Sequence, residues 1–196
     1  MAGFEKIDSV DVTSAGGSGL IEFTSVPQGY EHLYLVATMR LEYSGYQLYP
    51  WMLLDTSTDG STGTFSGVVN RHDLWGYMGK GTYSVFTTMS GYSQALLGEA
   101  ATSYWSPGTP SVPSTSAGAM SQHHTHIYNY SDSAKQTTIM YRSTAQDAHA
   151  TNVYNYYRWG GSTYGATGAV QYIKVGYSAS IAQGVGTTWQ LYGWNT

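Results

Sequence analysis

The sequence predicts an all-β protein: a β-sandwich, most simply a jelly roll, built from about ten short antiparallel strands. Three observations predict this fold. Apolar and polar residues alternate with a period of two in almost every segment. Turn-forming residues, 24 Gly among them, separate these segments, and 19 Tyr and 6 Trp supply side chains that favour strands. Since 196 residues suffice for one sandwich, we expect a single domain over residues 1–196.

The clearest predicted strand covers residues 33–41, where Leu33, Leu35 and Leu41 share one face. A short strand over 20–25 precedes it, followed by a turn in which Pro27 fixes φ and Gly29 permits a positive φ. A strand over 48–55 contains Pro50, which indicates an edge or a bulge. Further strands are expected at 65–72, 83–89, 122–130, 136–142, 153–159, 169–177 and 187–192, and the last of these should pair beside an early strand.

Two segments depart from the strand pattern. Residues 92–102 are the best place for a short helix, although Gly98 interrupts them. Residues 106–118 hold three of the five prolines among Ser, Thr and Gly, and we expect an extended loop there. This loop either stays on the surface of its own subunit or forms an arm that lies on a neighbouring one.

Composition and charge exclude several functions. The net charge of −4 and the absence of a basic stripe argue against nucleic-acid binding. The first nine residues carry three charges and no apolar run, so they do not resemble a signal peptide, and no stretch has the ~20 apolar residues of a membrane span. Only 10% of the residues are charged and 15% are aromatic, which favours burial of much of the surface against neighbouring subunits.

No motif indicates catalysis, and we predict a non-enzymatic protein without a cofactor. The twelve carboxylates are scattered and the chain has no Cys. Signatures of nucleophile elbows, zinc proteases and phosphate-binding loops are missing, and the glycines around Lys80 do not fit a phosphate-binding loop. A hydrolase on a β scaffold, such as a depolymerase, is the least favoured hypothesis.

A histidine cluster lies at residues 122–126. On a strand, His124 and His126 would share one face and His123 would occupy the other. Two imidazoles on one face form part of a transition-metal site that needs a third ligand from elsewhere. We favour the alternative, a polar strand on which the histidines stack, and therefore predict no metal site.

The segment 153–161 is rich in aromatic residues. Tyr154 and Tyr156 would share one strand face, and Tyr157 and Trp159 the other. One of these faces suits stacking on sugar rings, as in carbohydrate-binding modules. We favour an aromatic core on one side and a subunit contact on the other, because aromatic residues occur along the whole chain.

Four stretches together resemble one protein family: residues 20–40, 72–77, 127–137 and 186–193. Uncharacterised structural proteins of tailed phages, notably those of marine bacteria and cyanobacteria, show a similar opening, F-x-S-I-P-Q-x-Y-x-H-L, and a similar ending, G-S-x-F-S-L-Y-G. The resemblance covers the chain from about residue 20 to its end. This sequence departs from the pattern at Trp189, where Phe is usual, and in its proline-rich and histidine segments.

The resemblance implies a virion structural protein, synthesised in the host cytoplasm: a capsid decoration or cement protein, or a tail or fibre component. The resemblance assigns a catalytic role to no residue of this chain. We expect a homotrimer, with capsid or tail proteins as partners, since closed rings are a common form of assembly. The alternative is a carbohydrate-binding, receptor-recognising module that contacts host surface glycans through Tyr154, Tyr156 and Trp159.

Overall fold

The computed structural model describes residues 3–14, 20–40, 51–60, 68–79, 120–149, 152–164, 168–176 and 183–196. These residues form strands and turns and no helix. The sequence predictions for Pro50 and for residues 83–89, 92–102 and 106–118 fall outside the described residues. The strands are β1 (Glu5–Asp11), β2 (Leu20–Phe23), β3 (His32–Met39), β4 (Trp51–Asp55), β5 (Val68–Gly79), β6 (Ser121–Tyr128), β7 (Thr138–His149), β8 (Asn152–Tyr164), β9 (Tyr172–Gly176) and β10 (Thr188–Trp194).

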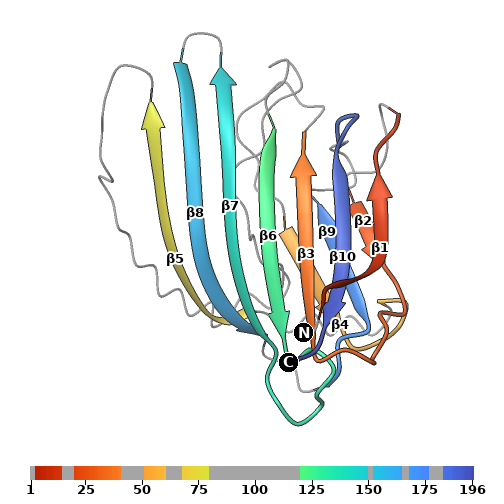
Figure 1. The fold of residues 1–196 in the computed structure, drawn as a ribbon. Coiled ribbons are helices and arrows are strands. Elements are labelled where there is room, and N and C mark those ends of the chain that lie inside the picture. Colours follow the sequence, from red (N-terminus) through yellow and green to blue (C-terminus); the bar gives the residue numbers. More distant parts are fainter. Residues whose placement is uncertain are drawn as a thin grey trace.

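Two antiparallel sheets face each other, which confirms the predicted β-sandwich. The larger sheet has the order β1-β10-β3-β6-β7-β8-β5, and the smaller sheet has the order β2-β9-β4. In both sheets, strands from the beginning and the end of the chain lie side by side: β10 lies between β1 and β3, and β9 lies between β2 and β4. Strands β7 and β8 extend the larger sheet and carry β5 at its edge (Figure 1).

The core lies between the two sheets, where alternate residues of each strand are buried. On β3, Leu33, Leu35, Ala37 and Met39 are at most 3% exposed, and the side chains that alternate with them are half-buried. They form one apolar cluster with residues of both sheets: Ile21, Phe23, Met52, Leu54, Ile127, Ile139, Tyr141, Ile173, Val175, Trp189 and Leu191. The indole Nε1 of Trp189 donates a buried hydrogen bond of 2.7 Å to Oε1 of Gln183. The polar end of this large aromatic side chain is therefore satisfied inside the core.

Strand β10 closes the larger sheet by pairing with both β1 and β3. This confirms that the C-terminal strand lies beside early ones, and Figure 1 shows both ends of the chain at the same end of the sandwich. Strand β1 itself was not predicted. It is an edge strand on which Glu5, Lys6 and Asp8 are exposed. Charged side chains on an edge strand hinder its pairing with other chains. They also obscure the alternation of apolar and polar residues by which a strand is recognised in a sequence.

The turn after β2 differs from the expected one. The residue with a positive φ is Ser25, at 52°, and Gly29 is not among the residues with positive φ. Ser25 donates its backbone N–H to the carbonyl of Thr58, and Val26 donates to that of Gln171. These bonds to neighbouring segments of the smaller sheet hold the left-handed conformation that a glycine would otherwise favour.

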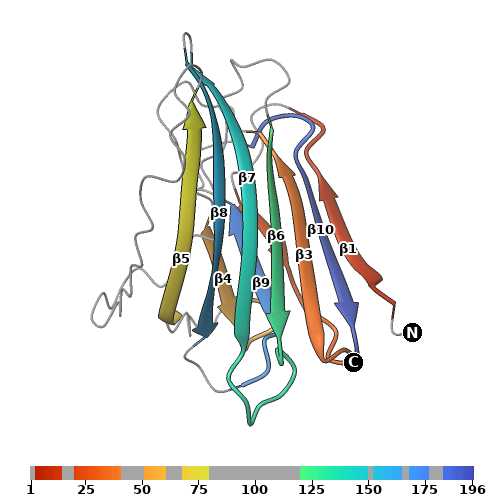
Figure 2. The same cartoon turned by 60° about the vertical axis from the view of Figure 1, so that its left-hand side comes forward.

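The face of the larger sheet that points away from the smaller sheet is called here the outer face. Figure 2 shows β4 and β9 stacked on the opposite side. In the described part of the chain no strand covers the outer face. No helix there has the length and apolar character needed to span a membrane.

Candidate binding surfaces

A continuous aromatic strip runs across three neighbouring strands on the outer face, with Phe4 from the residues before β1. Because side chains alternate between the faces of a strand, the strip takes every second residue of β3, β6 and β10. All its rings contact at least one other ring of the strip within 6.4 Å. The aromatic strip consists of Phe4, His32, Tyr34, His124, His126, Tyr128, Tyr192 and Trp194.

Tyr34 lies at the centre of the strip. Cross-strand pairing places it between Tyr192 of β10 and His126 of β6. Its ring stacks on that of His126 at a centroid distance of 4.4 Å and on that of His124 at 6.0 Å. Phe4, which is 55% exposed, covers it at 5.2 Å. Neighbouring rings in offset or tilted contact stabilise each other beyond the area they bury.

A second row of rings lies two residues further along the same three strands. The register places His32 between Trp194 of β10 and Tyr128 of β6. Its ring lies 4.3 Å from the ring of Trp194 and 5.3 Å from that of Tyr128. This row continues the strip toward the end of the sheet where both chain ends lie.

The centre of the strip also holds a polar network. The hydroxyl of Tyr34 lies 2.5 Å from Nδ1 of His124. Burial lowers the pKa of both His124 and His126, and the nearby positive charge of Arg142 on β7 lowers them further. Burial likewise raises the pKa of Tyr34. The imidazoles are therefore neutral near pH 7, and the positive charge in this part of the strip belongs to Arg142.

The predicted faces of the histidine cluster are confirmed. His123 is 3% exposed and points into the core, where Nε2 lies 3.0 Å from the hydroxyl of Ser121. His124 and His126 point outward and stack on Tyr34. In the part of the chain that the structure describes, no three His, Cys, Asp or Glu residues gather in a way that would hold a metal ion. Nδ1 of His126 is buried there without a hydrogen-bond partner.

The aromatic segment predicted at 153–161 forms most of β8. Trp159 is the cross-strand partner of Arg142 on the neighbouring strand β7, and its side chain is 61% exposed on the outer face. The side chains of Tyr154, Tyr156 and Tyr157 lie outside what the structure describes, so their proposed contacts with glycans or subunits stay predictions. The structure brings Trp159 together with Arg142, a residue that the sequence reasoning had not selected.

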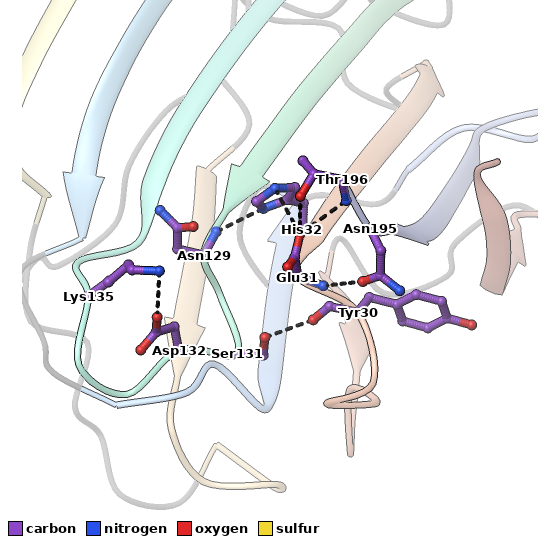
Figure 3. Close-up of polar contacts among 9 residues, drawn as sticks. All are labelled: Tyr30, Glu31, His32, Asn129, Ser131, Asp132, Lys135, Asn195 and Thr196. Carbon is purple, nitrogen blue, oxygen red and sulfur yellow. Dashed lines mark hydrogen bonds and ion pairs between the residues drawn. The ribbon is translucent and has the colours of Figure 1, made fainter. Parts of the chain in front are cut away.

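A polar cleft of about 610 Å³ opens at the end of the sandwich, beside the second row of the strip (Figure 3). The loop between β6 and β7 forms one wall. Tyr130 anchors this loop: its buried hydroxyl donates to the carbonyl of Pro27, and its carbonyl accepts a hydrogen bond of 2.7 Å from the N–H of Val170. The lining residues are Glu31, His32, Asn129, Ser131, Asp132, Ser133, Lys135 and Thr196.

On the opposite wall, Glu31 holds the C-terminal residues. Its Oε2 accepts hydrogen bonds from the backbone N–H of Thr196, at 3.0 Å, and from the hydroxyl of the same residue. The backbone N–H of Glu31 donates to Oδ1 of Asn195 at 2.7 Å. The two bonds from Thr196 lower the pKa of the Glu31 carboxyl, because they stabilise its charged form.

Further polar groups of the cleft, on His32, Ser131 and Lys135, also have protein partners. Nδ1 of His32 accepts a hydrogen bond of 3.2 Å from the N–H of Asn129, so this nitrogen carries no proton. The hydroxyl of Ser131 donates to the carbonyl of Tyr30, and Lys135 pairs with Asp132 at 2.9 Å. A serine nucleophile needs its hydroxyl directed at a base. The Ser131 hydroxyl is directed at a carbonyl instead, so the arrangement suits binding and support of the loop.

The chain matches no protein-family model, no curated protein and no solved structure. The candidate function therefore depends on these surfaces and on the sequence resemblance.

Sequence reasoning missed most of the aromatic strip. Tyr34 was visible as part of the polar face of its strand, and Tyr192 as part of the closing strand. Their proximity follows from the β3–β10 register, which pairs residues 158 positions apart in sequence (192 − 34). Only strand order and register bring these rings together, and neither can be read from one sequence.

Proposed function

We propose that this chain is a non-enzymatic structural protein of a phage virion, a capsid decoration or cement protein or a tail or fibre component. We propose further that it assembles as a homotrimer through the aromatic strip. The observation that carries the proposal is this strip on the outer face, with Phe4 55% exposed above it. The resemblance of both ends of the sequence to tailed-phage structural proteins supports the virion context.

The composition of the outer face supports a protein contact. Aromatic residues, Met and Arg are enriched in protein interfaces, while Lys, Glu and Asp are depleted. Beside the strip, Met140 is 43% exposed and Arg142 is also exposed. In a three-fold ring each subunit presents two different patches, so the strip would pack on another surface of the next copy.

The mass of the purified chain in solution, measured by light scattering, tests the assembly. We expect a trimer for the natural sequence and a monomer for Phe4→Asp, because a carboxylate would have to be buried among the rings of the interface. Val185→Asp is the matched control, since Val185 is 46% exposed in the loop before β10, at the opposite end of that strand from Trp194. A monomer that also fails to join phage particles would contradict the proposal.

The exposure of Trp159 favours a second candidate function, carbohydrate binding at a receptor on the host surface. A large aromatic side chain that remains 61% exposed on the face of a sheet is suited to stacking on sugar rings. A glycan array with no signal would remove this candidate and leave the assembly proposal untouched.

A further inference from the structure

Arg142 carries a positive charge that no described carboxylate neutralises. Lys135 pairs with Asp132 at 2.9 Å, and Lys174 pairs with Glu22 at 2.6 Å. Among the described side chains, no acidic group lies within ion-pair distance of Arg142, which is exposed on the outer face of β7. Its described polar neighbours are Tyr34, with whose hydroxyl the Arg142 side chain shares a hydrogen bond, and the two outward imidazoles, and all three are uncharged near pH 7.

Trp159 provides an exposed aromatic surface directly beside this charge. The two residues are a cross-strand pair of β7 and β8, and side chains of such pairs point to the same face about 5 Å apart at their Cβ atoms. Two residues along β8, Gly161 pairs with Met140 and occupies the same face. Because Gly161 has no side chain, β8 itself places no side chain on this face between Trp159 and the next outward residue, Thr163.

These groups match the chemistry of an acidic sugar. The C–H face of a pyranose ring packs on an aromatic ring, which the exposed side chain of Trp159 provides. A planar carboxylate accepts two parallel hydrogen bonds from a guanidinium group. We propose that Arg142 and Trp159 form a binding site for saccharides that carry a carboxylate group, such as uronic-acid units. This inference rests on the second candidate function and assigns its ligand class.

The physical character of the site sets the expected binding behaviour. One ring contact and one exposed ion pair give weak affinity for a single sugar, and the ion pair is screened by salt. A polymer that presents many acidic units to several copies of the chain would bind more tightly through avidity. Binding should therefore be readily measured with a polysaccharide and should weaken as salt is added.

The test compares three polymers on the intact chain by isothermal titration calorimetry: alginate, which is a polyuronate, dextran, which is a neutral glucan, and poly-glutamate, which is an acidic polymer without sugars. We expect binding of alginate alone. Trp159→Ala and Arg142→Gln should each weaken it about tenfold or more. Both side chains are exposed, so the fold should survive both changes, which circular dichroism checks. Val185→Ala and Lys6→Gln, an exposed apolar residue and an exposed cation on β1, should bind as the natural chain does.

Three results would overturn the inference. Equal binding of poly-glutamate would show that charge alone is recognised. Binding of dextran that is lost in Trp159→Ala and kept in Arg142→Gln would leave carbohydrate binding in place but remove the acidic ligand class. Binding of none of the polymers would remove the inference, and the glycan array then decides separately whether the second candidate function survives.

Discussion

The hydroxyl of Tyr34 on β3 lies 2.5 Å from Nδ1 of His124 on β6, and their rings stack with 24° between their planes. Tyr34 therefore belongs both to the aromatic strip and to the polar network beside Arg142. Since both residues are half-buried, the loss of one partner leaves the other without its hydrogen bond in a partly desolvated place. This pair makes the outer face sensitive to small chemical changes.

Tyr34→Phe should lower the free energy of unfolding by about 1 kcal/mol, because it removes the hydrogen bonds of the hydroxyl with His124 and Arg142 and keeps the ring. Urea unfolding followed by fluorescence measures the change. Tyr128→Phe is the matched control, since the hydroxyl of Tyr128 makes no hydrogen bond within the described part of the chain and its ring also lies in the strip. Equal losses in the two variants would contradict the role of the hydrogen bond.

Stability should fall as the pH decreases from about 7 to 5. Burial lowers the pKa of His124 and His126 in the folded chain, so the unfolded chain, with pKa values near 6.5, takes up protons first. The stability that the neutral imidazoles contribute is fully present above the unfolded pKa of about 6.5 and is lost as the pH falls toward their lower pKa in the folded chain. Urea midpoints measured at several pH values should show the decline.

The variant His124→Gln/His126→Gln should remove most of this decline. Glu22, Glu31 and Asp132 have lowered pKa values, so their contribution is present above their unfolded pKa near 4 and is lost only below it. The two pH ranges are therefore separable. An unchanged decline between pH 7 and 5 in the double variant would contradict the assignment to these histidines.

Gly193→Ala should destabilise the fold by about 1–3 kcal/mol, the range for overpacking. A Cβ atom at this position of β10 would lie 2.3 Å from Cγ and Cδ2 of the Tyr30 ring. These atoms are close to the Tyr30 backbone and cannot swing away easily. Gly29→Ala is the control, because nothing lies within 4 Å of a Cβ built there. Thermal unfolding that shows equal midpoints for both variants would contradict the close packing of Tyr30 on Gly193.

Glu31→Gln should loosen the end of β10 and leave the rest of the sandwich unchanged. The amide side chain keeps one acceptor oxygen but loses the charge that strengthens its bonds with Thr196. Hydrogen exchange should be faster at the amide of Thr196 and unchanged at Leu191 in the core. Asp8→Asn, an exposed carboxylate on β1, provides the control for loss of one negative charge.

Much of the fold could be predicted because its signals are local. The alternation at 33–41 and 187–192 marked β3 and β10, and Leu33 and Leu35, which the pattern places on one face, are both buried. Strand ends were less accurate: β7 continues to His149 and β8 to Tyr164, well beyond the predicted 142 and 159. Polar and glycine residues fill these extensions, because backbone pairing between long neighbouring strands maintains them without an apolar pattern.

The candidate site was less predictable, because its parts come from distant segments. Trp159 was selected from the sequence, but its partner Arg142 follows only from the β7–β8 register. The polar cleft joins residues near positions 31, 132 and 196, which no sequence motif connects. The outward direction of His124 and His126 was predicted correctly, since strand alternation is a local property.

The position of β10 has a consequence for how the chain folds. Since β10 separates β1 from β3, neither can complete its pairing until residues 188–194 have left the ribosome. Until then two strand edges stay open, and contacts between the first and last strands must close a loop of most of the chain. Such non-local pairing makes folding slow and exposes the nascent chain to aggregation. Commitment to the native sandwich thus waits for β10, and the yield of folded protein should respond to chaperone supply and to temperature during synthesis.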